Sequence, residues 1–211
     1  RLAAAGHSVS LLTNLSVPLD IIQRFVAAAG AALRTFSCSL HREQTDEAEF
    51  LAKAMRVREL LAALAKATCV VNSVIVPGQI GQLTETRRRF EAAGLKFYPQ
   101  LMRENGEPVH YGWLDRRRLA RHFGDLTQPG EMNRGYSHSG RLCHAGHRYF
   151  IVTPKGDAYT CYPGKRFGDG FLGNIFDGSF ALRGGPLPCA YAVCPCTVPQ
   201  NRGIVAMPSL P

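Results

Sequence analysis

Five of the seven cysteines gather in the last third of this 211-residue chain, and thiolates are good ligands for soft metals. Seventeen residues separate the first of them from the second, and the next gaps are twenty-seven, four and one. The five are Cys143, Cys161, Cys189, Cys194 and Cys196. The odd total of cysteines and the lack of a secretory leader argue against a disulfide framework. We therefore expect a thiolate-bound metal in a reducing compartment, which predicts a cytoplasmic protein.

The spacing of these cysteines leaves the metal open between zinc and iron. Four thiolates can enclose either a zinc ion or an iron–sulfur cluster. Structural zinc sites usually use two short cysteine pairs, whereas only Cys194 and Cys196 are close neighbours here. The two earlier cysteines, Cys38 and Cys69, fall within apolar runs and are interpreted as buried structural thiols.

The elements around the late cysteines are predicted to be short. Residues 149–153 and 157–161 flank Pro154-Lys155-Gly156, a pattern typical of a β-hairpin that returns Cys161 toward Cys143. A short helix is predicted at 177–182. Upstream of the hairpin, residues 113–123 predict a helix, and residues 124–142, rich in glycine and polar side chains, predict a linker.

The first hundred residues alternate short apolar runs with amphipathic stretches. Strands are expected at 9–12, 33–40, 69–76 and 95–101, with helices between them, one starting at the Asp46-x-x-Glu49 capping pattern. Short connections of this kind predict right-handed crossovers and a parallel α/β sheet. Apolar and small polar residues alternate in 33–40, which suits a barrel-like sheet whose polar face lines a cavity. Ligands would then bind at the carboxyl ends of the strands.

These patterns divide the chain into four parts. Residues 1–111 are expected to be the later part of a larger barrel, because four strands do not close one. A helix and linker follow at 112–142, then a small cysteine-rich α+β domain at 143–200, built on a hairpin plus a helix, and a tail at 201–211. Arg1 in place of Met indicates an internal start. No apolar run approaches the roughly 18 residues that a membrane span needs, so no membrane partner is expected.

The hairpin cysteines form a recognisable pattern with its glycine. Cys143, twelve residues, Gly156, four residues and Cys161 match the opening of the SPASM and twitch auxiliary domains of radical SAM enzymes. The run Leu172-Gly173-Asn174-Ile175 is similar to the sequence that commonly follows in those domains. The second half of the chain therefore resembles that family.

Polar residues in the first half resemble the same family. Thr13-Asn14 is similar to the Thr-Asn of the family's third barrel strand. Ser39-Leu40-His41 is similar to the Ser-[Ile/Leu]-Asp run of the fourth strand, and Asn72 lies in the fifth. The resemblance thus covers nearly the whole chain.

The resemblance implies a fold and an activity. The chain would hold strands three to six of a partial (β/α)6 TIM-like barrel, followed by the auxiliary domain. Four of the five late cysteines would bind an auxiliary 4Fe-4S cluster, and Asn14, Ser39 and Asn72 would contact S-adenosylmethionine. The parent chain would be a radical SAM oxidoreductase of the maturase type, with S-adenosylmethionine and a second 4Fe-4S cluster. It would modify a peptide or small metabolite through a 5′-deoxyadenosyl radical, with flavodoxin or ferredoxin as the reducing partner.

The sequence departs from the family pattern in three ways, and each limits which family properties are expected of this chain. The Cys-x(3)-Cys-x(2)-Cys motif and the Gly-Gly-Glu-Pro segment do not occur in this sequence, so it is not expected to cleave S-adenosylmethionine alone, and no catalytic residue is assigned. His41 stands where an aspartate is usual. Three tail cysteines are too few for a two-cluster domain, so a single-cluster, twitch-like domain fits better.

The net charge of +9 raises the possibility of a nucleic-acid partner. The densest basic runs, Arg87-Arg88-Arg89 and Arg116-Arg117-Arg118, each lie in a predicted helix. We interpret them as solvated helix faces, because no aromatic residues interleave with either run, and nucleic acid is not an expected partner. The rival hypothesis is a non-enzymatic, zinc-stabilised module that uses these basic faces on nucleic acid.

Structural roles stay open for the polar candidates. Asn14 can cap the helix that follows it, and Ser39 and Asn72 can be ordinary polar residues inside a barrel. His144 and His147 are expected to lie beside a metal ligand or face solvent, since closeness to Cys143 in sequence is a weak indication of ligation.

Overall fold

The computed structural model describes residues 3–104, 107–123, 137–192, 194 and 203–205. The chain divides into two units, of which the first comprises Arg1–Met102 and Tyr111–Gly124. The second comprises Arg103–His110 and Asp125–Pro211. Most of the linker predicted at 124–142 and of the tail predicted at 201–211 lies outside the described residues.

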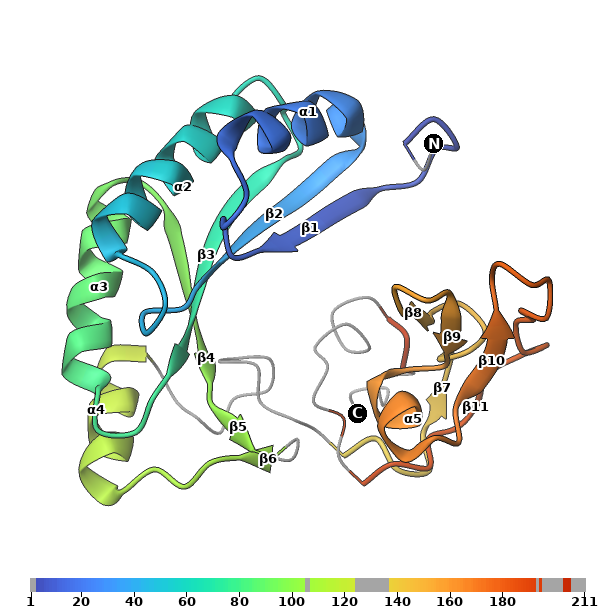
Figure 1. Ribbon diagram of the computed structural model, residues 1–211. Coiled ribbons are helices and arrows are strands. Elements are labelled where there is room, and N and C mark those ends of the chain that lie inside the picture. Colours follow the sequence, from blue (N-terminus) through green and yellow to red (C-terminus); the bar gives the residue numbers. More distant parts are fainter. Residues whose placement is uncertain (1–2, 105–106, 124–136, 193, 195–202, 206–211) are drawn as a thin grey trace, which may run out of the picture. The chain divides into compact units, whose positions relative to one another are not determined.

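A four-stranded parallel sheet forms the centre of the first unit, in the order β1-β2-β3-β4 (Figure 1). Its strands are β1 (Val9–Thr13), β2 (Leu33–Leu40), β3 (Thr68–Ile75) and β4 (Lys96–Leu101). The connections contain α1 (Leu19–Ala29) with the 3-10 turn η1 (Gly30–Ala32), then α2 (Glu47–Leu61) and α3 (Ile80–Ala92). The mixed α/β fold with a parallel sheet, predicted from the alternation of strands and helices, is confirmed.

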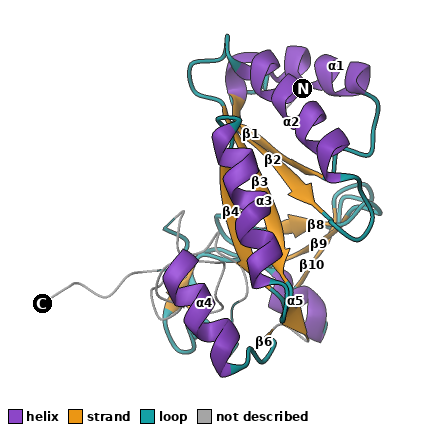
Figure 2. Ribbon diagram, turned by 90° about the vertical axis from the view of Figure 1, so that its left-hand side faces the viewer, coloured by secondary structure: helices purple, strands orange, loops and turns teal. Residues whose placement is uncertain are grey.

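Helices α1, α2 and α3 lie along one face of this sheet (Figure 2). The alternation in β2 explains why that face is covered, because Phe36, Cys38 and Leu40 point the same way and are buried. Ser37 and Ser39 lie between them on the opposite, polar face. The two faces therefore have different uses: one builds the core and the other presents hydroxyl groups.

Three phenylalanines join the helices to the sheet. The ring of Phe90 in α3 lies 6.1 Å from that of Phe50 in α2 and 5.8 Å from that of Phe97 in β4, centroid to centroid. All three side chains are buried. The start of α2 follows the predicted capping pattern, since Oδ1 of Asp46 accepts a hydrogen bond from the N–H of Glu49 at 2.9 Å.

A fourth helix, α4 (Trp113–Phe123), spans the residues predicted for it and packs against α3. Its buried Leu119 faces the rest of the unit. The hydroxyl of Tyr111, just before the helix, donates to the carbonyl of Ile75 at 2.6 Å and accepts from the N–H of Met102 at 2.9 Å. Neither α4 nor any other helix of the described residues is long and apolar enough to cross a membrane.

In the described part of the second unit, the elements are short strands and one short helix. β5 (Arg103–Glu104) pairs with β6 (Glu107–Pro108), and β7 (Leu142–Cys143) pairs with β11 (Leu187–Pro188). A three-stranded sheet contains β8 (Ile151–Val152), β9 (Asp157–Tyr159) and β10 (Phe171–Asn174), in the order β10-β9-β8, and α5 (Tyr162–Phe167) follows β9. The hairpin predicted around Gly156 is confirmed by the antiparallel pairing of β8 with β9.

The helix predicted at 177–182 is wrong. Residues 175–178 form a turn, and Oδ1 of Asp177 accepts hydrogen bonds from the N–H and the hydroxyl of Ser179 at 2.9 and 2.6 Å. Such local bonds offer the backbone an alternative to the helix. Among the described residues of this unit, the helix is α5, which was not predicted from the sequence because it contains Pro163 and Gly164.

Removing the central phenylalanine ring tests this account of the core. We expect Phe90→Ala to lower the free energy of unfolding of the first unit by about 3–5 kcal/mol, because the truncation leaves a cavity between α2, α3 and β4. Leu12→Ala is the control, since Leu12 is 67% exposed in β1, and it should change stability by less than about 0.5 kcal/mol. Urea denaturation followed by circular dichroism measures both; equal losses would contradict the assignment of Phe90 to the core.

Candidate metal centre

The hairpin turn that precedes Cys161 requires a glycine. Gly156 has a φ of +89°, in the left-handed region that favours glycine. Its N–H donates to the carbonyl of Thr153 at 2.9 Å, which closes the turn. A β-carbon at position 156 would collide with the ring of Phe176 and lie 2.7 Å from Oδ1 of Asn174. Any side chain at this position would therefore displace its neighbours.

The side chain of Asn174, at the end of the neighbouring strand β10, forms hydrogen bonds to the same turn. Its Nδ2 donates to the carbonyl of Lys155 at 3.0 Å and to Oδ1 of Asp157 at 2.9 Å. The next residue, Ile175, donates its N–H to the carbonyl of Gly156 at 3.0 Å. The glycine of the Cys-x(12)-Gly-x(4)-Cys pattern and the asparagine of the later Leu-Gly-Asn-Ile run thus belong to one hydrogen-bonded structure.

Three of the late cysteines meet although they are far apart in the sequence. Cys143 ends β7 and is paired with Leu187 of β11, two residues before Cys189. The N–H of Cys189 donates to the carbonyl of Arg141 at 2.9 Å, which continues this pairing. Cys161 follows β9 and is the N-cap residue of α5. Each thiol is therefore held by a different backbone element.

The thiols of Cys143, Cys161 and Cys189 line one cavity of about 220 Å³. A water molecule occupies about 30 Å³ in the liquid, so the cavity has room for a group of several heavy atoms. Its polar lining comprises Thr160, Asp169, Arg183 and Tyr191. Soft thiol ligands around a space of this size suit a soft metal or a metal–sulfur group.

Burial and neighbouring groups shift the pKa values of two cavity thiols. Burial raises the pKa of the Cys143 and Cys161 thiols above their ordinary value, and the neighbouring Cys189 thiol raises both pKa values further. Arg183 lowers the pKa of Cys143, and the N–H of Gly164, 3.4 Å from Sγ of Cys161, lowers the pKa of that thiol. A bound metal would favour the ionised form of the Cys143 and Cys161 thiols, because metal ligation requires thiolate.

The two other predicted metal ligands are Cys194 and Cys196. Cys194 is buried and follows the cavity residue Tyr191 by three positions, whereas Cys196 lies outside the described residues. Within the described ranges, no three His, Cys, Asp or Glu side chains are grouped to hold one metal ion. A single zinc ion needs its thiolates about 2.3 Å from the metal.

His144 and His147 contact each other. Their Nδ1 atoms are 3.1 Å apart, and their rings stack with centroids separated by 5.4 Å. Neither imidazole lines the cavity of the three thiols. Whether either histidine would contact a bound metal stays a prediction.

Two of the three predicted cofactor residues lie together on the polar face of the sheet. The hydroxyl of Ser39 donates to Oδ1 of Asn72 at 3.0 Å, and Nδ2 of Asn72 donates to the hydroxyl of Ser37 at 2.6 Å. Asn14 takes no part in these bonds; its Oδ1 accepts the N–H of Ser16 at 3.1 Å on the exposed loop after β1. Asn14 is not the helix cap either, because Pro18 is the N-cap residue of α1.

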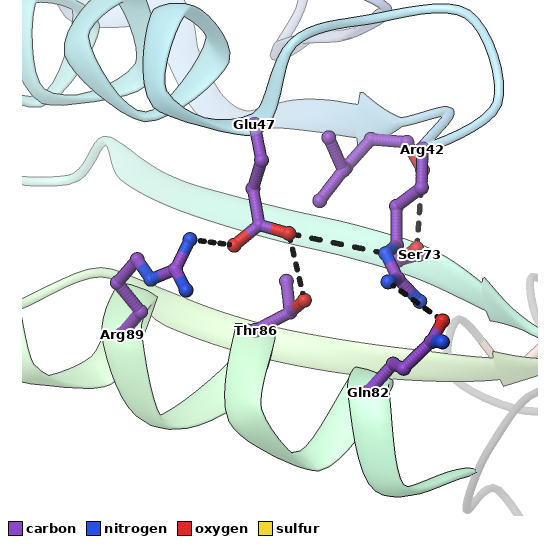
Figure 3. A network of polar contacts seen from close by, with 7 residues as sticks. Arg42, Glu47, Ser73, Gln82, Thr86 and Arg89 are labelled. Carbon is purple, nitrogen blue, oxygen red and sulfur yellow. Dashed lines mark hydrogen bonds and ion pairs between the residues drawn. The ribbon is translucent and has the colours of Figure 1, made fainter. Parts of the chain in front are cut away.

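A second cavity, of about 570 Å³, lies at the carboxyl ends of β2 and β3. Its polar lining comprises His41, Arg42, Glu43, Ser73, Gln79 and Gln82. Nε of Arg42 lies 3.9 Å from Oε2 of Glu47, and Nη2 donates to Oε1 of Gln82 at 3.2 Å (Figure 3). Glu47 also accepts hydrogen bonds from Thr86 at 2.8 Å and Arg89 at 2.7 Å.

Of the residues that line this cavity, His41 was singled out from the sequence and Arg42 was not. The available signal was the place of Arg42 directly after a strand, at the edge where ligands bind in parallel sheets. Its partner Glu47 lies within the Asp46-x-x-Glu49 capping pattern and was not singled out, so the network was not apparent from the sequence.

Comparisons with known proteins give no relative for this chain. No protein-family model, no curated protein and no solved structure matches it. What can be inferred about its function therefore comes from its residues and their arrangement.

Replacing the turn glycine tests whether the hairpin holds the thiols in place. Gly156→Ala should destabilise the second unit by about 2 kcal/mol or more, because the new β-carbon meets Phe176 and Asn174. Gly168→Ala is the matched control, since Gly168 also has a positive φ, +78°, but open space around it, and should cost only about 1 kcal/mol. Urea denaturation compares the two; an equal loss would show that crowding at 156 is unimportant.

The raised thiol pKa values predict a pH dependence of the metal-free protein. A thiol that ionises less readily when folded stabilises the folded state below its unfolded pKa of about 9, and this contribution is lost as the pH rises further. The metal-free second unit should therefore lose stability above about pH 9. In the double variant Cys143→Ser/Cys161→Ser, the loss of stability over the same pH range should be smaller. Denaturation at a series of pH values measures this; identical pH profiles would contradict it.

Proposed function

We propose that this chain is the later part of a radical SAM enzyme and that its second unit is a twitch-like auxiliary domain for a 4Fe-4S cluster. The observation that carries the proposal is the meeting of Cys143, Cys161 and Cys189 at one cavity. Two of these thiols belong to the Cys-x(12)-Gly-x(4)-Cys pattern on which the resemblance depends. The turn at Gly156 and its contact with Asn174 support it further, because they link the two motif runs physically.

The residues of the second unit would hold the cluster in distinct ways. Cys143, Cys161 and Cys189 would be ligands, with the fourth thiolate from Cys194 or Cys196. Arg183 would offset the negative charge of the thiolates, since it already lowers the pKa of Cys143. The N–H of Gly164 would donate to the Cys161 sulfur. When bound, the cluster would accept or relay an electron, or help to position the substrate.

The first unit would supply strands three to six of a partial (β/α)6 barrel. Ser39 and Asn72, with Asn14 at the end of β1, would contact S-adenosylmethionine, and the cavity beside Arg42 would help to bind a peptide or small metabolite. The Cys-x(3)-Cys-x(2)-Cys motif that generates the 5′-deoxyadenosyl radical would lie in a part of the enzyme outside this sequence. A cytoplasmic reductant such as flavodoxin or ferredoxin would supply electrons.

Anaerobic reconstitution with iron and sulfide tests the auxiliary cluster. The chain should bind about four irons and about four sulfides and become brown. Cys143→Ala and Cys161→Ala should each abolish this loading, whereas Cys38→Ala, which removes a buried thiol of the first unit, should leave it unchanged. A colourless protein with stoichiometric zinc would instead support the zinc-stabilised module.

The same experiment identifies the fourth ligand. Because Cys189 lines the cavity, the spare cysteine should be Cys194 or Cys196, and only one of these two alanine variants should retain full iron loading. Loss of the cluster in both variants would contradict a site in which five cysteines fill four places.

A further inference from the structure

The two arginine runs of the sequence converge on one groove between α3 and α4. The groove has a volume of about 580 Å³, and its charged lining is Arg88 from α3 with Arg117, Arg118 and Arg121 from α4; His122 of α4 also lines it. Gly81, Thr84 and Leu114 complete the lining. Each run alone looks like an ordinary solvated helix face, and only the packing of α4 on α3 makes them a single concave surface.

The positive charge of this groove is largely uncompensated. Among the residues that the structure describes, no acidic side chain lines it. Arg88 has an exposed partner, Glu85, at 3.8 Å, where an ion pair contributes little. Arg117, Arg118 and Arg121 have no carboxylate partner among the residues that the structure describes. A concave surface with several unpaired cations concentrates anions at its surface.

The groove is also held in shape without a ligand. Nη1 of Arg87 donates to the carbonyl of His122 at 2.7 Å, and its guanidinium lies 5.4 Å from the ring centroid of Phe123, which fixes the end of α4. At the start of α4, Oδ2 of Asp115 accepts the N–H of Gly78 at 2.8 Å. A preformed site loses less entropy on binding than one that has to be ordered.

We propose that this groove binds an acidic peptide segment of a partner protein. Planar guanidinium groups pair with carboxylates through two parallel hydrogen bonds, and the four charged side chains of the lining are all arginines. Leu114, 51% exposed in the groove, and Trp113, 66% exposed on the same helix, offer contact to apolar side chains between the acidic ones. Single-stranded nucleic acid favours aromatic residues interleaved along a basic track, whereas Trp113 and the buried Phe123 lie at the two ends of α4 and not between its arginines.

The partner site is independent of the proposed cluster. It uses residues of the first unit alone, so its failure and the failure of iron loading in the second unit are separate outcomes. Trp113 is the only tryptophan of the chain, so its fluorescence reports on α4 directly.

The test measures binding of a short fluorescein-labelled peptide that alternates paired glutamates with leucines. Fluorescence anisotropy with the full chain should give saturable binding, and Trp113 emission should change in parallel. The double variant Arg118→Glu/Arg121→Glu should weaken binding by about tenfold or more. The matched control is Arg24→Glu/Arg116→Glu: both arginines are exposed and outside the groove, Arg116 lies on α4 itself, and the loss of net charge is the same. This control should weaken binding by less than about threefold.

Three outcomes would overturn the proposal. Equal weakening in the two double variants would mean that net charge alone attracts the peptide. Tighter binding of a single-stranded oligouridylate of equal charge, lost in the groove variant, would assign the groove to nucleic acid. If the peptide shows no saturable binding even at low ionic strength, the groove is not an acidic-peptide site. Because every altered side chain is exposed, circular dichroism should show that all variants fold.

Discussion

The cysteine cavity depends on backbone hydrogen bonds between segments that are distant in the chain. β7 pairs with β11, and this pairing alone brings Cys143 beside the segment that carries Cys189. The hairpin of β8 and β9 returns the chain so that Cys161 reaches the same cavity. β8 and β9 are only two and three residues long, so they form few backbone hydrogen bonds. Side-chain hydrogen bonds, such as that of Asn174 to the turn, add to the stability of the hairpin.

These bonds also set the electrostatics of the site. Holding thiols together in a buried cavity raises the pKa of Cys143 and Cys161, so the metal-free arrangement is a neutral, protonated one. Arg183 and the N–H of Gly164 act in the opposite direction and favour thiolate. A bound metal–sulfur group would remove the conflict, because it lowers the thiol pKa values far more than either neighbour does.

The first unit was predictable because its signals are local and periodic. The alternation in β2, the capping aspartate of α2 and the apolar stripes of the helices each predict their element without tertiary information. The second unit was less predictable from the sequence. α5 is only six residues long, contains Pro163 and Gly164, and is capped by the thiol of Cys161, a residue that sequence rules do not count among caps. The turn at Asp177 replaced a predicted helix because its side chain bonds locally. The pairing of β7 with β11, and the groove shared by two arginine runs, arise only from tertiary packing.

Mössbauer spectroscopy of the chain loaded with isotopically enriched iron tests the central claim most directly, because it reports how the irons are coupled and what surrounds them. If Cys143, Cys161 and Cys189 share one cluster, the spectrum should show a single 4Fe-4S species with delocalised valence and sulfur coordination at its irons, and Cys161→Ser should alter it. A spectrum of isolated iron ions, or one that is unaffected by this substitution, would contradict the account.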